Sequence, residues 1–454
     1  MFNNGKFITQ FYITILFVAS FTLSAYYIYQ TPIEKHLLQS IATRRREIDE
    51  QYCQGPCRFI NLLHVPEQET RAQLHVRHVA FTAGLVNRTL VLPNVSESRI
   101  GACQKRDFSF YYNEESWANA NRDSFKTISM QDYKAWLQAR KEINQPALSN
   151  VFLVRNKYWD REHYIKRLVN CFQNMTEEAL NYVPEFIWHP AASRKKKNAS
   201  PMDEAKMVDF LKGGPITRQI DNTTTFTFYE HDHIEVIDLF YAVGHTFSQA
   251  KQANQVIPYS KELVSLAQST SAALSPYVAV HWRMETISKE DSLLLDCARS
   301  LITQLDTRIN HTGTLFLLTD YPHIFTRAQQ DLAIHDTATD AELRSWVIPY
   351  SDTFHYDNIG PVHHLAIQYL YEHRNITLFG KNYPYSPPQW RIMNAPETDH
   401  GYLGILDKLM AVNADVFLAG RPHVCARAST FTAQIQLERK NKLGENSHYF
   451  GYDI

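Results

Sequence analysis

The sequence predicts an α/β protein made of two doubly wound halves that face each other across a cleft. Short apolar runs of β-type residues alternate with amphipathic stretches of helical length, first at about 57–93 and again at about 259–441. Strand, helix, strand in this order is the unit of a parallel sheet. The 454 residues are enough for two domains of ordinary size, which we place at 51–258 and 259–454.

The first half opens with a strand-like run at 57–65 that ends in the polar loop 66–70. An amphipathic helix is expected over about 71–86, with apolar side chains near one stripe. A short strand at 89–93 follows, stopped by a proline. Residues 104–260 are rich in aromatic and polar side chains, and their pattern predicts no clear order of elements.

The second half repeats the alternation more regularly. Helices are expected at about 259–273, 291–304, 361–374, 402–413 and 429–441, and strands at 277–282, 313–318, 376–379 and 416–419.

The strand at 277–282 leads into the most informative residues of the chain, His281 and Arg283. Their i, i+2 spacing puts both on the same side of the strand end. In an open α/β sheet, ligands bind at the carboxyl ends of the strands. A guanidinium there suits a diphosphate, which it can hold through two parallel hydrogen bonds. An isolated His-x-Arg is also compatible with a strand-end arginine in a structural salt bridge. Other features of the sequence are needed to distinguish these two interpretations.

The amino-terminal part predicts a membrane anchor. Residues 7–29 are 23 uncharged residues, long enough to cross a bilayer as a helix. We expect a cytosolic tail at 1–6, the transmembrane signal-anchor at 7–29 and a membrane-proximal stem at 30–50. The formal net charge of −1 gives no indication of a nucleic acid partner.

The residues after the predicted stem have the features of a protein from an oxidising compartment. An even number of cysteines beside many glycosylation sequons predicts disulfides and a lumenal location, in the endoplasmic reticulum or Golgi membrane. The cysteines are Cys53, Cys57, Cys103, Cys171, Cys297 and Cys425, and the sequons begin at Asn87, Asn94, Asn174, Asn198, Asn222, Asn310 and Asn375.

Metal-ligand patterns are weak in this sequence. No two aspartates stand at i, i+2, so the Asp-x-Asp that holds a divalent cation in many nucleotide-sugar transferases is missing. The pairs at 231–233 and 363–364 lack a third ligand at a fixed spacing and are interpreted as structural. A transferase of this kind would neutralise its leaving group with Arg283 and a helix N-terminus instead of a metal.

Three segments resemble the GDP-fucose protein O-fucosyltransferases, a family with the two-Rossmann (GT-B) fold. They are Ala83–Pro93, Val278–Arg283 and the run from Gly404 through Ala414–Gly420 and Ser429–Phe431 to Glu438-Arg439. Their order and spacing cover about 65–440. The resemblance implies GDP-fucose as donor, a Ser or Thr hydroxyl of a folded, disulfide-rich protein as acceptor, inversion at the sugar carbon and no divalent metal or other cofactor.

The resemblance also implies roles for individual residues. Arg283 would bind the β-phosphate and stabilise the departing GDP, which makes it the first catalytic candidate. Six further positions would contact the donor: His281 beside Arg283, Asp320 after a strand, Asp407 on a helix, and Ser429, Thr430 and Phe431 at a helix N-terminus. Asp320 and Ser429-Thr430 also fit ordinary helix caps.

The acceptor hydroxyl needs a general base. One branch of the resembled family has a glutamate in the first loop, where this chain offers Glu67 as the preferred candidate and Glu69 as the next. Two solvated carboxylates without a role remain the alternative, and in the other branch Arg283 alone would carry the chemistry. The chain departs from the family in this loop, which lacks glycine, and in Met284-Glu285-Thr286 after the arginine.

Two other functions stay open at this point. The first is a fucosyltransferase that acts on a glycan, which would need a narrower acceptor cleft. The second is a catalytically silent relative that binds cysteine-rich client proteins in the lumen, an alternative that the altered first loop keeps open.

Overall fold

The computed structural model describes residues 39–156, 185–188, 200–212, 216–219, 225–228, 234–285, 293–309, 314–321, 360–380, 390–394, 399–444 and 449–452. The predicted anchor at 7–29 lies outside these residues. None of the helices within the ranges just given combines the length and the hydropathy that a bilayer span requires.

A first unit is built on a six-stranded parallel sheet with the order β5-β2-β1-β10-β6-β7. Its strands are β1 (Phe59–His64), β2 (Thr89–Val91), β5 (Lys126–Ile128), β6 (Ser149–Asn156), β7 (Glu185–Trp188) and β10 (Val236–Ala242). Around it lie α2 (Glu69–Leu85), η1 (Phe108–Phe110), α3 (Glu114–Asn121), α4 (Met130–Glu142), α7 (Pro201–Lys212), η2 (Lys251–Asn254) and the strand pairs β3 (Val95–Ser96) with β4 (Arg99–Ile100) and β8 (Ile216–Gln219) with β9 (Thr225–Phe228).

A second unit has a six-stranded parallel sheet with the order β14-β13-β12-β11-β15-β16. Its strands are β11 (Tyr277–Trp282), β12 (Thr314–Thr319), β13 (Ile376–Gly380), β14 (Trp390–Asn394), β15 (Val416–Gly420) and β16 (Tyr449–Tyr452). Its helices are α8 (Lys261–Leu274), α9 (Leu293–Gln304) with the turn η3 (Leu305–Ile309), α12 (Pro361–His373), α13 (His400–Asn413) and α14 (Thr430–Leu443).

The prediction of an α/β fold with two parallel sheets is confirmed. In the second sheet the chain runs from β11 outward to β14, then returns to the other side of β11 with β15 and β16. The order therefore reverses between β11 and β15, and ligands bind at such a switch point in doubly wound sheets. The corresponding reversal in the first sheet lies beside β1. The strands β5, β6 and β10 come from the region whose pattern predicted no clear order.

Strand β11 is buried along its whole length because helices cover both faces of its sheet. Its alternating side chains enter two different cores. Val278, Val280 and Trp282 pack in one apolar cluster, while Tyr277 and Ala279 pack in the other. The period of two in a strand separates these sets, so β11 forms the centre of the second unit and carries Arg283 at its end.

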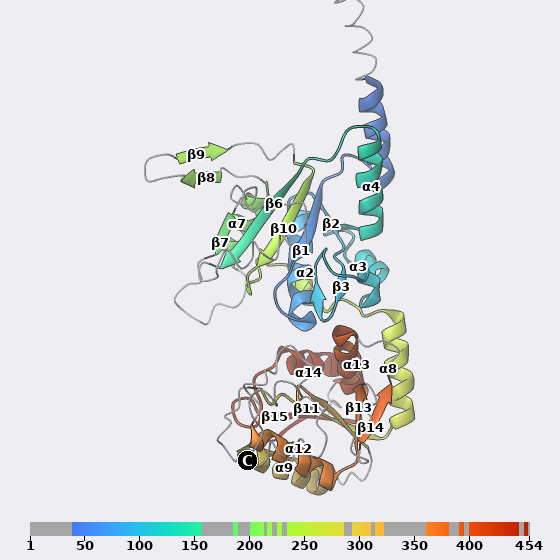
Figure 1. The fold of residues 1–454 in the computed structure, drawn as a ribbon, viewed down its shortest axis with the longest axis vertical. Helices are drawn as coiled ribbons and strands as arrows, with labels where there is room; N and C mark the ends of the chain where they lie inside the picture. Colours follow the sequence, from blue (N-terminus) through green and yellow to red (C-terminus); the bar gives the residue numbers. More distant parts are fainter. Residues whose placement is uncertain are drawn as a thin grey trace, which may run out of the picture.

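The two units meet through the segments that follow the carboxyl ends of their strands (Figure 1). The side chain of Asp399 caps α13 by accepting the N–H of Tyr402 at 2.9 Å. The same carboxylate crosses to the first unit, where it accepts the N–H of Glu97 at 2.6 Å and hydrogen bonds from Ser96 and Tyr111. The start of α13 is therefore attached to the first unit.

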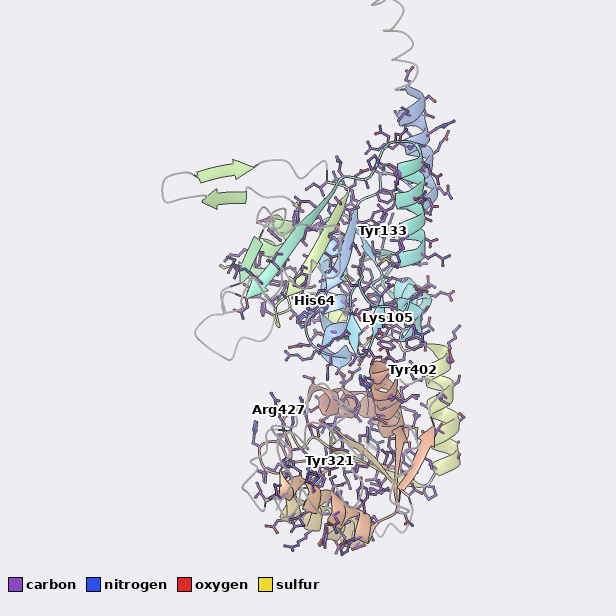
Figure 2. The ribbon with its side chains drawn as sticks, viewed as in Figure 1. His64, Lys105, Tyr133, Tyr321, Tyr402 and Arg427 are labelled. Carbon is purple, nitrogen blue, oxygen red and sulfur yellow. A yellow bond between two sulfur atoms is a disulfide. The ribbon has the colours of Figure 1, made fainter. Side chains whose placement is uncertain are left out.

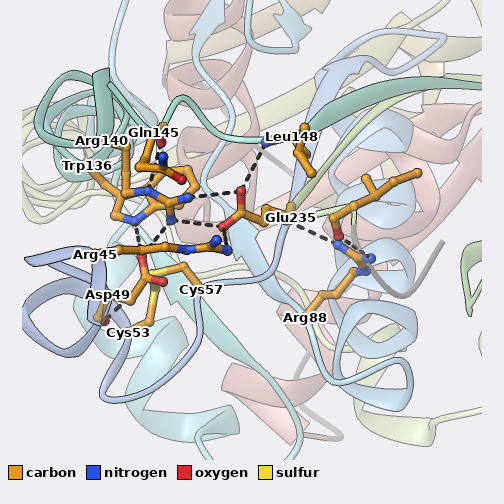
Figure 3. A network of polar contacts seen from close by, with 11 residues as sticks. Arg45, Asp49, Cys53, Cys57, Arg88, Trp136, Arg140, Gln145, Leu148 and Glu235 are labelled. Carbon is orange, nitrogen blue, oxygen red and sulfur yellow. Dashed lines mark hydrogen bonds and ion pairs between the residues drawn. A yellow bond between two sulfur atoms is a disulfide. The ribbon is translucent and has the colours of Figure 1, made fainter. Parts of the chain in front are cut away.

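The described end of the predicted stem is a helix attached to the first unit (Figure 3). Asp49 accepts hydrogen bonds from the indole of Trp136 at 2.9 Å and from Arg140 at 3.0 Å. Arg140 also pairs with the buried Glu235 at 2.8 Å, and Arg45 reaches the same carboxylate at 2.9 Å. These bonds satisfy the buried charges and fix this helix against α4.

Disulfides join Cys53 to Cys57 and Cys297 to Cys425, and Cys103 is also disulfide-bonded. Among the sequons in the described ranges, Asn94 is buried and donates its amide to the carbonyl oxygens of Ala102 and Gln104. An amide committed in this way has no room for a glycan.

Candidate active site

Arg283 emerges directly from the carboxyl end of β11, next to the switch point of the second sheet. Its side chain is 23% exposed and forms an ion pair with Glu285. One guanidinium nitrogen lies 3.5 Å from the carbonyl oxygen of Ala428, just before α14. The arginine is therefore held between its own strand end and the start of a helix while part of it faces solvent.

His281 lies one strand period before Arg283 and is almost fully buried. Its Nδ1 is 2.7 Å from the hydroxyl of Thr432 in the first turn of α14, and its ring centroid lies 5.1 Å from that of Phe431. Burial, helped by the charge of Arg283, lowers the pKa of His281 to about 3. The imidazole is therefore neutral near pH 7, and it positions the start of α14 by contact rather than by charge.

This neutral histidine predicts a pH dependence of stability. At pH values between the ordinary histidine pKa of 6.5 and the lowered pKa of His281, the unfolded chain binds a proton that the folded protein lacks. Stability is therefore lost as pH falls through this window, by up to about 1.4 kcal/mol per pH unit from this group. We expect His281→Asn to lose unfolding free energy less steeply between about pH 6 and 4 in urea titrations. A variant slope equal to that of the wild type would contradict this account, and the exposed His373→Asn serves as control.

The N-terminus of α14 is the second part of the site. Ser429 is its N-cap and accepts the N–H of Thr432 at 3.4 Å, so the alternative of a helix cap is confirmed for this hydroxyl. Thr430 and Phe431 occupy the first turn, where unpaired backbone N–H groups favour an anion. The structure thus brings His281, Arg283 and the start of α14 together.

Asp320 follows β12 and supports the turn after Arg283. Its two carboxylate oxygens accept the backbone N–H groups of Met284 at 2.8 Å and Glu285 at 3.2 Å. Burial raises the pKa of Asp320 to about 7 against the effect of these hydrogen bonds. Both oxygens are already used, so Asp320 shapes the strand end beneath the site and does not present a free carboxylate to a donor.

Asp407 lies on α13, apart from the group around Arg283. Its Oδ1 is buried and has no hydrogen-bond partner among the described residues, and burial raises its pKa well above the ordinary range. Gly404, one turn earlier on the same helix face, borders open space: an added Cβ there would meet nothing within 4 Å. A buried carboxylate oxygen without a donor, on a residue beside open space, is suited to receive an N–H group from a ligand.

Glu67 stands in the first unit, in the loop between β1 and α2. Its backbone φ of 76° is left-handed, a conformation uncommon for a residue with a side chain. Its carboxylate pairs with Arg71 at 2.9 Å, lies 3.6 Å from the Nε2 of the buried His75 and is 30% exposed. Its other oxygen faces Gly244, after β10. An oriented, solvent-reachable carboxylate of this kind suits a general base.

Glu69, the other candidate base, is buried and fully engaged. It accepts hydrogen bonds from Gln73 and Tyr112, each at 2.9 Å, and forms an ion pair with Lys408 at 2.8 Å. The hydroxyl of Thr70, at 3.2 Å, is a fourth donor to this carboxylate, so no lone pair is left for an acceptor hydroxyl. The geometry therefore assigns Glu69 a structural role and leaves Glu67 as the candidate base.

Lys408 is a residue that the sequence pattern did not reveal. Its ammonium is fully buried on α13 and also contacts the hydroxyl of Tyr259 at 2.6 Å and the side-chain oxygen of Gln434 at 3.1 Å. It lies 5.4 Å from the ring centroid of Phe431. A lysine between apolar residues of a predicted helix was the available signal, because such a charge requires a buried partner.

Within the described ranges, no group of three or more His, Cys, Asp and Glu side chains is arranged to hold a metal ion. His364 contacts the hydroxyl of Tyr321 at 2.5 Å, as expected of a structural histidine. The pair at 231–233 lies outside the described residues.

No protein-family model matches the chain, and no curated protein sequence matches it at a significant level. Solved structures of POFUT1 are similar to it. The complex with GDP-fucose has 13% sequence identity and a TM-score of 0.46, with 89% of this chain and 99% of that chain covered. The apo form has 12% identity and a TM-score of 0.44, and a complex with GDP 12% and 0.42, each covering 88% of this chain and 99% of the other.

Proposed function

We propose that this protein transfers fucose from GDP-fucose to a Ser or Thr hydroxyl of a folded protein domain, with inversion and without a divalent metal. The two units would act as the halves of a GT-B enzyme, the second binding the donor and the first the acceptor. The observation that carries the proposal is the joint placement of Arg283 and the N-terminus of α14 at the switch point of the second sheet.

The chemistry follows from this placement. As the bond between the sugar C1 and the β-phosphate oxygen breaks, its electron pair and a negative charge pass to GDP. Arg283 and the backbone N–H groups of α14 are aimed at that charge, which they stabilise most in the transition state. The acceptor oxygen forms the new bond to C1 from the opposite face and gives its proton to Glu67.

The nucleoside is assigned to Asp407, Thr430 and Phe431 as a proposal. Guanine presents N–H donors on one edge, and the carboxylate of Asp407 has a buried oxygen without a donor. Hydrogen bonds to the ionised form would lower the raised pKa of Asp407 and favour the charged state on binding. A partner of this kind would also satisfy the buried Oδ1 of Asp407, which has no hydrogen-bond partner among the described residues.

The role of Glu67 is tested by Glu67→Gln. We expect GDP release from GDP-fucose to fall by about 10²-fold or more, since general bases contribute this much, while the affinity for GDP stays the same. The partly exposed side chain should leave the unfolding midpoint close to that of the wild type. Glu262→Gln, on the exposed face of α8, is the matched control. A Glu67→Gln variant with wild-type turnover would remove Glu67 from the mechanism.

We further propose a single-pass protein of the endoplasmic reticulum or Golgi membrane with a lumenal body. The supporting observations are the disulfide-bonded cysteines, with none free in the described ranges, and the exposed sequon positions Asn87 and Asn375. A glycosidase-induced mobility shift of the protein made in cells would bear this out, and an unglycosylated, reduced protein would contradict it.

The proposed function is tested first on the full-length protein with GDP-fucose, in buffer containing EDTA. Turnover to GDP that resists EDTA is the expected result. Binding of GDP-fucose without turnover, with any acceptor protein or glycan supplied, would favour the silent relative. Transfer to free glycans in preference to folded domains would favour the glycan-directed enzyme. No binding of GDP or GDP-fucose would overturn the donor assignment.

A further inference from the structure

A second arginine lies beside Arg283 and shares its carboxylate. Arg427, in the loop between β15 and α14, forms an ion pair with the same oxygen of Glu285 that Arg283 contacts. Glu285 is only 1% exposed, whereas the side chain of Arg427 is 48% exposed. Figure 2 shows Arg427 at the edge of the second unit. Both guanidinium groups therefore contact the same buried carboxylate, that of Glu285.

The position of Arg427 is fixed by its loop and does not depend on a ligand. Its backbone N–H donates to the carbonyl oxygen of Arg283 at 3.1 Å. Two residues earlier, Cys425 accepts the indole N–H of Trp282 at 2.7 Å and is disulfide-bonded to Cys297 on α9. The loop is therefore attached to the end of β11 at two points and to α9 through the disulfide, so the entropy cost of ordering Arg427 is met during folding.

The remaining donors of both side chains are available on the solvent side. Each guanidinium carries five N–H groups. Arg283 donates to Glu285 and Ala428, and Arg427 donates to Glu285. The Nε atoms of Arg283 and Arg427 and the Nη2 of Arg427 have no partner among the described residues. Two guanidinium charges face the carboxylate of Glu285 and the buried Asp320 beneath it, whose raised pKa of about 7 leaves it only partly charged near pH 7, so the site at the N-terminus of α14 keeps a net positive charge.

We propose that Arg283 and Arg427 form a two-arginine clamp for a diphosphate, with Glu285 holding both guanidinium groups from below. Each arginine takes one phosphate, and the N–H groups of α14 complete the site. Glu285 stays in place on binding, so no bond within the protein has to break. The clamp deepens the proposed function and rests on it for the identity of the nucleotide, but it makes its own claim about the diphosphate.

The test uses inorganic pyrophosphate and GDP as probes, with calorimetry on the full-length wild type and on Arg427→Met. Because hydrogen bonds to charged groups contribute more than neutral ones, we expect both ligands to bind the variant about 10- to 100-fold more weakly. Guanosine, which lacks phosphate, should bind both proteins equally. Lys440→Met removes a cation from the far end of α14 and should bind like the wild type. Arg427→Lys, which keeps the charge but not the fork, should be intermediate and replaces the methionine variant if that one fails to fold.

The outcomes separate the clamp from the proposed function. Equal affinity of wild type and Arg427→Met for pyrophosphate overturns the clamp, even if GDP-fucose is turned over. Wild-type protein that binds neither pyrophosphate nor GDP also overturns it. Pyrophosphate binding that depends on Arg427, in a protein that does not turn over GDP-fucose, supports the clamp and contradicts the proposed function.

Discussion

Replacing Lys408 with methionine is expected to lower the free energy of unfolding by about 3–5 kcal/mol, the usual cost of breaking a buried ion pair. The substitution removes the ammonium but keeps the length of the side chain. It leaves the carboxylate of Glu69 buried between the two units without its counter-charge, and it leaves Tyr259 without the group that contacts its hydroxyl at 2.6 Å. Urea unfolding of the full-length protein at pH 7 measures the loss.

A second variant shows whether the uncompensated charge is the cause. Lys408→Met combined with Glu69→Gln removes both charges and is expected to recover a large part of the lost stability, because the buried carboxylate is then neutral. Lys442→Met, whose ammonium lies on the exposed face of α14 near Asn413, should change stability by less than about 0.5 kcal/mol. A double variant less stable than Lys408→Met would refute the electrostatic account.

Arg283→Met is expected to reduce turnover of GDP-fucose by about 10³-fold, since a preorganised cation at a departing phosphate contributes this much or more. In the proposed reaction the guanidinium acts most strongly on the charge that develops on GDP, so the loss should fall mainly on kcat. The partly exposed position and the neighbouring Arg427, which keeps a counter-charge on Glu285, should let the variant fold. Steady-state kinetics of GDP release measures the effect.

The matched control is Arg299→Met, an arginine on α9 that pairs with Asp296 at the surface. It should retain wild-type kinetics. If Arg283→Met kept full turnover while Arg427→Met lost it, the leading catalytic role would pass to Arg427. If neither variant changed turnover, the site at the end of β11 would not be the donor site.

Much of the fold was readable from sequence because its elements are encoded by neighbouring residues. The apolar run that forms β11 and the amphipathic stretches that form α2, α8 and α13 were expected within a few residues of their observed bounds. Burial on both faces makes a parallel strand continuously apolar, and this pattern is visible without a structure. The strands β5, β6 and β10 were not readable, since aromatic and polar residues around them obscure the period.

The candidate site, like the fold, was predictable from the sequence only in part. The positions of His281, Arg283 and Ser429 at element ends followed from local pattern, because strand ends and helix caps are short-range features. The shared carboxylate of Arg283 and Arg427 did not, since Glu285 and Arg427 stand 142 positions apart. The pair of Glu69 with Lys408 joins residues 339 positions apart. Because of this ion pair, Glu69 is assigned a structural role instead of the role of a general base.

The sequence by itself determined the class of fold, the order of most elements in the second unit and the place of Arg283 at the end of its central strand. Only the tertiary structure decided which charges are buried together, which carboxylate remains reachable and which cation joins Arg283. The physical reason is that backbone conformation depends on adjacent residues, whereas burial and charge pairing depend on how the two sheets and their helices pack.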